Sequence, residues 1–177
     1  MVRKIVILIL TSIFISSCII YATGVFDEKL FLKRQNYIGN ELRLDGYYYL
    51  LIGNEIFGSM IFYRNGVVLF GKGSAPNYEP FSFMENQFNR YQTDLRYQED
   101  KTNWGIFIIK NNLIKIENWG TSSGGPLKSY LKDGKILNDT TFVLYNNSIE
   151  GEIDTVGTIY HFKQYSPKPD STNRFIK

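Results

Sequence analysis

The side chains able to do chemistry in this 177-residue sequence are few, and its only histidine, His161, limits them further. A hydrolase with a serine or cysteine nucleophile needs an imidazole base, and the usual zinc triads need more histidines or several cysteines. In the run Tyr160-His161-Phe162, the histidine alternates with two aromatic residues. On a strand whose aromatic side chains face the core, His161 faces solvent, so we interpret it as a surface residue.

A row of alternating carboxylates, Glu150, Glu152 and Asp154, is the other candidate for catalysis. Paired carboxylates can bind Ca²⁺ or hydrolyse glycosides, but these lack the loop spacing of a calcium site and suit a solvated strand face. The loop at 121–126 (TSSGGP) lacks the Lys-Ser/Thr of a phosphate-binding loop. We interpret it as a connection, with a gate at a pocket mouth as the alternative. We therefore predict a protein that is not an enzyme and holds no metal and no cofactor.

The only cysteine, Cys18, follows a segment with the order of a secretory signal. Arg3 and Lys4 form a basic head, residues 5–15 (IVILILTSIFI) are apolar, and two serines precede the cysteine. The apolar run is shorter than the ~20 residues needed to span a bilayer. The sequence therefore predicts a lipoprotein signal peptide over residues 1–17.

The four residues Ile15-Ser16-Ser17-Cys18 resemble the bacterial lipobox, in which an aliphatic residue and two small residues precede a cysteine. The resemblance implies that Cys18 becomes the mature N-terminus and carries acyl chains, since its thiol is the nucleophile for thioether formation. Each buried CH₂ contributes ~0.8 kcal/mol, so two or three chains hold a protein firmly on a membrane. Two alternatives stay open: an ordinary signal peptide with a buried cysteine, and an uncleaved anchor over residues 5–26.

The composition indicates one ordinary folded domain. Apolar residues make up 44% and aromatic residues 16%, which excludes collagen, coiled coil and long disorder. The net charge of +3 includes Arg3 and Lys4, so it falls to +1 when the signal peptide is removed. A nearly neutral chain has no global attraction to nucleic acid, and no nucleic-acid partner is predicted.

From residue 42 onward the pattern is that of short β-strands joined by tight turns. Strands are predicted at 42–52, 56–63, 67–71, 104–110, 113–118, 140–145, 148–153 and 158–165. Turns are predicted at Asn65-Gly66, which has the sequence of a type I′ turn, and at Asn111-Asn112, 132–135 and 146–147. One helix is expected at about 83–97, with Ser82 as its N-cap and the apolar stripe Met84, Phe88, Tyr91 and Leu95.

Many short strands joined by hairpins must hide their edges, and closure into a barrel does so. We predict a mainly β fold: a small antiparallel meander barrel of about eight strands with one helix near 83–97. The alternative is an open sheet or sandwich covered by the helix. The barrel domain is expected at 41–166, after a tether at 18–40 and before a C-terminal tail at 167–177.

A barrel of about eight strands has room for its own side chains or for one small ligand. Strand periodicity proposes a ligand-lining set of seven aromatic residues: Tyr47, Tyr49, Phe62, Phe70, Trp104, Phe107 and Tyr160. The hypothesis is a non-enzymatic protein that binds a small apolar or amphipathic molecule. The alternative is a structural or protein-interaction lipoprotein whose core is filled by side chains.

The lipobox and the Asn-Gly hairpin are accompanied by the runs Leu44-Asp45-Gly46-Tyr47-Tyr48, 104–108 (WGIFI), 138–142 (NDTTF), 160–162 (YHF) and 168–172 (KPDST). Together these features resemble a group of small, largely uncharacterised lipoproteins of Bacteroidota with lipocalin-like β-barrels. The Gly-x-Trp signature of true lipocalins is absent. The resemblance implies a cell-envelope protein attached to a membrane through acylated Cys18. In that phylum, surface lipoproteins are similar in having acids directly after the cysteine. Here the first acids are Asp27 and Glu28, so we expect the outer membrane, facing the periplasm.

Overall fold

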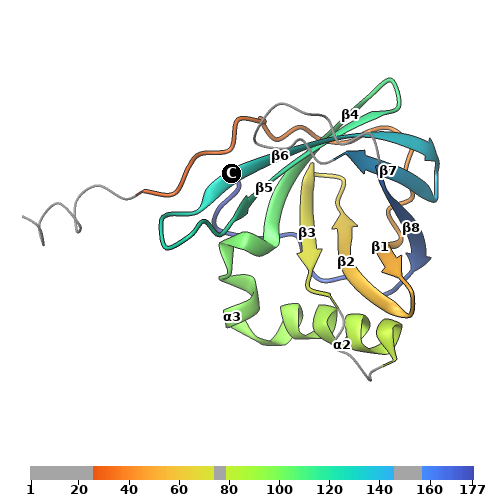
Figure 1. The fold of residues 1–177 in the computed structure, drawn as a ribbon, viewed down its shortest axis with the longest axis horizontal. Coiled ribbons are helices and arrows are strands. Elements are labelled where there is room, and N and C mark those ends of the chain that lie inside the picture. Colours follow the sequence, from red (N-terminus) through yellow and green to blue (C-terminus); the bar gives the residue numbers. More distant parts are fainter. Residues whose placement is uncertain (1–25, 74–78, 146–156) are drawn as a thin grey trace, which may run out of the picture.

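The computed structural model describes residues 26–73, 79–145 and 157–177, and in them eight strands close into an antiparallel barrel (Figure 1). The strands are β1 (Gly46–Ile52), β2 (Glu55–Phe62), β3 (Val67–Gly71), β4 (Trp104–Lys110), β5 (Leu113–Gly120), β6 (Lys128–Asn138), β7 (Thr141–Tyr145) and β8 (Thr158–Gln164). Each pairs with the next in sequence, and β8 returns to β1 with Tyr48 opposite Phe162. The predicted meander barrel is confirmed, and closure gives every strand a neighbouring strand on each side.

The hairpin turns follow the sequence signals in part. Asn111 and Asn112 both have positive φ, 52° and 60°, as a type I′ turn requires. At Asn65-Gly66 only the glycine has a positive φ, 81°, so the predicted type I′ turn is wrong. The chain instead takes four residues to reverse, and the Tyr63 N–H donates to the Val67 carbonyl across them.

The turn predicted at 132–135 is also wrong, because β6 runs through it without a break. Gly134 is required there by close packing rather than by a turn. A Cβ on it would lie 2.3 Å from the Val143 carbonyl oxygen and 2.7 Å from a methyl group of Leu144. The predicted strand at 148–153 and turn at 146–147 lie outside the described residues, as does the carboxylate row at 150–154.

The single helix predicted at 83–97 is two helices, α2 (Pro80–Thr93) and α3 (Leu95–Gln98), followed by the 3₁₀ turn η1 (Lys101–Asn103). Glu79, not Ser82, is the N-cap, and its carboxylate accepts the Ser82 N–H at 2.6 Å. Asp94 ends α2 in an extended conformation, and its carboxylate caps α3 through the Arg96 N–H. The predicted stripe therefore stops early, and Leu95 is exposed.

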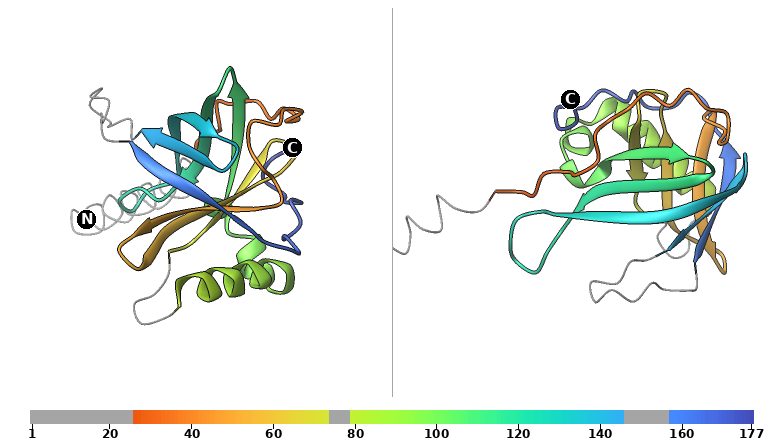
Figure 2. Two further views of the ribbon diagram at one scale, coloured as in Figure 1. Left: turned by 90° about the vertical axis from the view of Figure 1, so that its right-hand side faces the viewer. Right: turned by 90° about the horizontal axis from the view of Figure 1, so that it is seen from above.

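The barrel has two apolar cores, one inside and one outside. The inner core includes Tyr48, Phe62, Phe107 and Phe142. The outer core lies between the outer face of β1–β5 and a layer made of α2, α3 and the two terminal segments. Figure 2 shows α2 beneath the barrel and the N-terminal segment along the opposite side. Both faces of β2–β4 are therefore buried over most of their length, which explains why these strands are rich in apolar residues rather than alternating.

The predicted tether and tail contact the barrel where the structure describes them. In the N-terminal segment, the Glu28 N–H donates to the Leu127 carbonyl and the Tyr37 N–H to the Arg64 carbonyl. In the C-terminal segment, Pro169 accepts from the hydroxyl of a buried tyrosine of the β2–β3 turn, and Ile176 is buried. The folded unit therefore includes residues 26–40 and 167–177. Across the described ranges, no helix has the length and apolar character needed to cross a bilayer.

Candidate functional site

The seven predicted lining residues divide between the two cores. Phe62 and Phe107 belong to the inner core, and Phe70 and Tyr160 pack against it, so these four point into the barrel. The pairing register agrees, because Phe70 lies opposite Met60 and Tyr160 opposite Phe142, both of which are inner residues. The choice of inward side is therefore correct for strands β2, β3 and β8.

Tyr47, Tyr49 and Trp104 point outward, so the prediction that they line the interior is wrong. Tyr47 is fully buried against Phe88 of α2, with ring centroids 5.2 Å apart. The Trp104 indole N–H donates to the Gln98 carbonyl of α3 at 3.0 Å. Both faces of β1 and β4 carry large aromatic residues, so the alternation alone did not identify the inner face. Only the covering helices explain why the outer face is also apolar.

The middle of the barrel is occupied by aromatic rings. Phe62 lies 4.8 Å from Phe107, 5.6 Å from Tyr48 and 5.7 Å from Phe142 between ring centroids. All four side chains are at most 1% exposed. Tyr48 donates its hydroxyl hydrogen to the Asp139 carbonyl at 2.6 Å, and burial raises its pKa. The four rings form one continuous packed layer across the interior.

The inward side of β5 and β6 also carries polar groups. Asn118 and Lys132 both take inward positions, since Lys132 is opposite the inner residue Ile116. The Asn118 Oδ1 atom is buried without a hydrogen-bond partner in the described part of the chain. Burial lowers the pKa of Lys132, and within 26–73, 79–145 and 157–177 it has no ion pair. Tyr160 stacks on Phe142 at 5.1 Å, and burial raises its pKa.

The sequence candidates for catalysis do not form a described active site. His161 is exposed on the outer face, 6.2 Å from the ring of Tyr49, as the strand pattern predicted. Cys18 and the carboxylates at 150, 152 and 154 lie outside the described residues. In the part of the chain that the structure describes, no group of three or more His, Cys, Asp or Glu residues could hold a metal ion.

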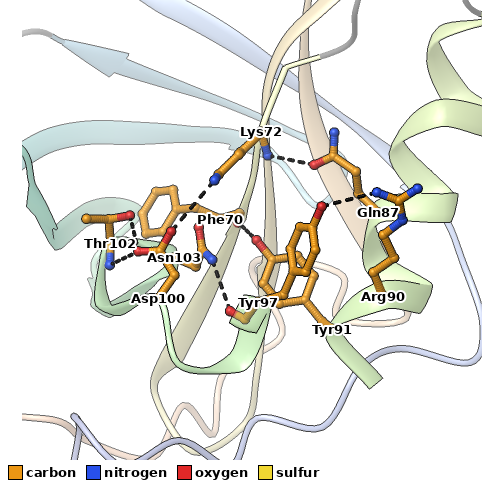
Figure 3. A network of polar contacts seen from close by, with 9 residues as sticks. All are labelled: Phe70, Lys72, Gln87, Arg90, Tyr91, Tyr97, Asp100, Thr102 and Asn103. Carbon is orange, nitrogen blue, oxygen red and sulfur yellow. Dashed lines mark hydrogen bonds and ion pairs between the residues drawn. The ribbon is translucent and has the colours of Figure 1, made fainter. Parts of the chain in front are cut away.

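A polar network joins the helical layer to β3, and Figure 3 shows its members. Tyr91 of α2 donates its hydroxyl hydrogen to the Phe70 carbonyl at 2.9 Å, and the Lys72 N–H donates to Gln87 at 3.2 Å. The Lys72 ammonium lies 3.6 Å from the carboxylate of Asp100. These groups satisfy one another between covering helix and strand, so we interpret the network as a structural clamp.

A groove of about 620 Å³ lies on the outside of the barrel, between the two terminal segments. Its apolar wall includes Ile106, Trp119 and Ile176, all of which are buried. Basic residues surround it from both segments and from η1: Lys29, Lys33, Arg34, Lys101, Arg174 and Lys177. Among the described residues, the acids that line it are Asp27 and Glu28. We refer to it below as the basic groove.

The two acids of the basic groove are held in ion pairs. Asp27 lies 2.9 Å from the Lys101 ammonium, and Glu28 lies 2.8 Å from the Lys128 ammonium. The hydrogen bonds from these lysines hold the pKa of each carboxyl below its usual value. The Lys101 ammonium also lies 4.3 Å from the centre of the Trp119 ring, a favourable cation–π geometry. The remaining basic residues of the groove thus exceed its acids in charge.

Glu117, which the sequence analysis did not select, fixes the N-terminal segment at this groove. Its side chain on β5 is fully buried and accepts the backbone N–H groups of Phe31 at 2.9 Å and Leu32 at 2.7 Å. It also accepts the hydroxyl of Ser129 on β6. The available signal was a lone carboxylate in the predicted strand 113–118, on the face opposite Ile114 and Ile116; if that face is also covered, a carboxylate there needs a buried partner.

The fold defines the class of protein: a closed, eight-stranded antiparallel barrel with an external helical layer. No family model matches the chain, and no match was found among curated proteins or solved structures.

Proposed function

We propose that this protein is a lipid-anchored, non-enzymatic lipoprotein of the bacterial envelope that acts through its outer surface rather than through a hollow barrel. The anchor is the acylated Cys18 predicted from the lipobox, and the site is the outer membrane on its periplasmic side. Between the two hypotheses drawn from the sequence, this is the one with a filled core.

The observation that carries the proposal is the aromatic layer of Tyr48, Phe62, Phe107 and Phe142. Sites for drug-sized ligands are clefts of about 300–1,000 Å³ that bury most of the ligand. Here the centre of the barrel is packed with rings at contact distances of 4.8–5.7 Å. Space of the required size, about 620 Å³, is instead found outside the barrel in the basic groove.

The test begins with protein purified gently from its native envelope. Intact mass spectrometry should show two or three acyl chains on Cys18, and solvent extraction should recover no stoichiometric small molecule beyond those chains. Crosslinking in the envelope should recover the same neighbouring proteins for the wild type and for a variant in which aromatic residues of the inner core are substituted. A stoichiometric apolar metabolite in the extract would overturn the filled-core proposal.

A second candidate, a carrier of a small amphipathic molecule with an anionic end, is favoured by one specific observation. On the inward side of β5 and β6, the buried Asn118 Oδ1 atom has no hydrogen-bond partner, and the half-buried Lys132 side chain has no ion pair, among the described residues. An unpaired buried polar group costs about 1–3 kcal/mol unless a ligand or water satisfies it. Native mass spectrometry of wild type and Lys132→Met decides the matter, because a carrier should lose its bound molecule in the variant.

A further inference from the structure

We propose that the basic groove and the N-terminal segment beside it dock onto the anionic surface of the bilayer that holds the acyl anchor. This inference rests on the proposed lipid anchor and names the partner of the groove. The partner is a bilayer with anionic phospholipid headgroups.

Chain length places the groove close to the membrane. Eight residue steps separate Cys18 from Phe26, the first described residue, so a fully extended chain spans at most about 26–29 Å. The basic groove begins at the very next residue, Asp27. No other face of the barrel is joined so directly to the anchor. Whatever the path of the linking residues, the groove remains within reach of the bilayer surface.

Charge makes this face complementary to anionic lipid. Lys29, Lys33 and Arg34 follow one another along the exposed segment, and in the described part of the chain they form no ion pair. Both acids of the groove are already neutralised by lysines. Attraction to an anionic bilayer corresponds to about a fivefold gain in binding for each Lys or Arg near the surface. Three such residues together favour docking by about a hundredfold over a neutral surface.

Exposed aromatic residues accompany these charges. Phe26 is 84% exposed and Phe31 is 82% exposed, so two large apolar side chains of the segment face solvent. Along the segment, exposure alternates: Leu30 and Leu32 pack on the outer core, while Phe31 lies exposed between two exposed lysines. Aromatic rings interleaved with basic residues are typical of surfaces that sit at the membrane–water interface.

The segment is held rigidly enough to present this surface. Buried Glu117 accepts the N–H groups of Phe31 and Leu32, and the Trp119 indole N–H donates to the Glu28 carbonyl at 2.7 Å. The ordering of residues 28–32 is therefore achieved by the fold before any membrane contact. A preorganised surface loses less entropy on docking than a free linker would.

The experiment uses the full chain, acylated and reconstituted into vesicles, with an environment-sensitive fluorophore on a cysteine introduced by Asn36→Cys. Asn36 is exposed and follows the basic run by two residues. Because acylation consumes the thiol of Cys18, the introduced cysteine is the only reactive thiol. The probes are vesicles of neutral phosphatidylcholine alone and vesicles with one third phosphatidylglycerol.

We expect a blue-shifted emission in the anionic vesicles only, reversed by 0.5–1 M salt, because the Debye length then falls to about 3–4 Å. Each charge contributes about fivefold to docking, so the double variant Lys33→Gln with Arg34→Gln should weaken docking by about 25-fold. The matched control is Lys110→Gln with Lys135→Gln, which removes the same charge from the far end of the β4–β5–β6 sheet and should leave the shift unchanged.

Identical spectra in neutral and anionic vesicles would overturn the inference, and so would an unchanged shift in the Lys33/Arg34 variant. A response to soluble polyglutamate without any response to anionic vesicles would assign the groove to an acidic protein and also overturn it. Intact mass separates these failures from failure of the anchor: unacylated protein takes up two labels instead of one. That result refutes the proposed anchoring on its own.

Discussion

Replacing Glu117 by glutamine should release the N-terminal segment from the barrel. The carboxylate accepts one backbone N–H on each oxygen and a serine hydroxyl in addition. Glutamine keeps the shape but has one acceptor oxygen, so its NH₂ group must face either the Phe31 N–H or the Leu32 N–H. One charge-assisted bond is lost and one buried donor is left unpaired, which together cost about 2 kcal/mol.

The sensitive assay is limited trypsinolysis, because trypsin cleaves after Lys33 and Arg34. When opening is fast relative to cleavage, the rate follows the population of the open segment. A loss of about 2 kcal/mol raises that population, and the cleavage rate, about 30-fold. Glu55→Gln is the matched control, since Glu55 begins β2 and forms no ion pair in the described part of the chain. It should leave the rate within twofold.

A cleavage rate for Glu117→Gln within threefold of wild type would contradict the claim that Glu117 holds the N-terminal segment on the barrel. It would mean that Leu30 and Leu32, which pack on the outer core, hold the segment without the carboxylate. Circular dichroism must show the barrel intact at the assay temperature, so that cleavage reports the segment and not global unfolding.

Three further predictions concern the two cores and the groove. Phe142→Ala should lower the free energy of unfolding by about 3–5 kcal/mol in urea denaturation, whereas exposed Phe57→Ala should change it by less than about 0.5 kcal/mol. Trp119 fluorescence should be constant above about pH 5 and change as pH falls below about 4. The pKa of Asp27 is depressed, and protonation of Asp27 removes its ion pair with Lys101, whose ammonium lies over the Trp119 ring. Lys132→Met should raise the thermal midpoint at pH 7 by about 2–4 °C for each kcal/mol of stability gained. The gain should shrink at high pH, where the desolvated lysine of the wild type is already neutral. An unchanged midpoint at pH 7 would show that the Lys132 ammonium stays solvated.

Strand periodicity and turn residues were sufficient to predict most of the barrel. The hairpin at Asn111-Asn112 follows from two residues that accept positive φ, and the last strand follows from the alternation around His161. The antiparallel meander and the helical insertion follow from local signals. The strand β6 was not predicted, because a turn was expected at 132–135, and the predicted strand at 148–153 lies outside the described residues. Gly134 shows where local signals fail: Asp-Gly is a common turn dipeptide, but here the glycine serves close packing against β7.

The inner and outer faces could not be separated from the sequence alone. On β1, Tyr47 and Tyr48 are both at most 1% exposed, and they belong to different cores. A one-residue choice of face inverts every assignment along a strand. The predicted inward side is correct on β2, β3 and β8 and wrong on β1. On β4, Trp104 and Phe107 were both predicted to face inward, although they lie on opposite faces.

Most of the elements and their order can be predicted from the sequence, because turns, alternation and helix stripes are local properties of a few neighbouring residues; β6 and the division of the helix could not be. The sequence also determined the candidate anchor at Cys18, which depends only on a short contiguous motif. Closure of β8 on β1, the filled centre and the basic groove were decided by the tertiary structure. Each depends on residues 45 to 145 positions apart, from Phe62 and Phe107 in the filled centre to Lys29 and Arg174 at the groove, and no local pattern specifies which distant segments meet.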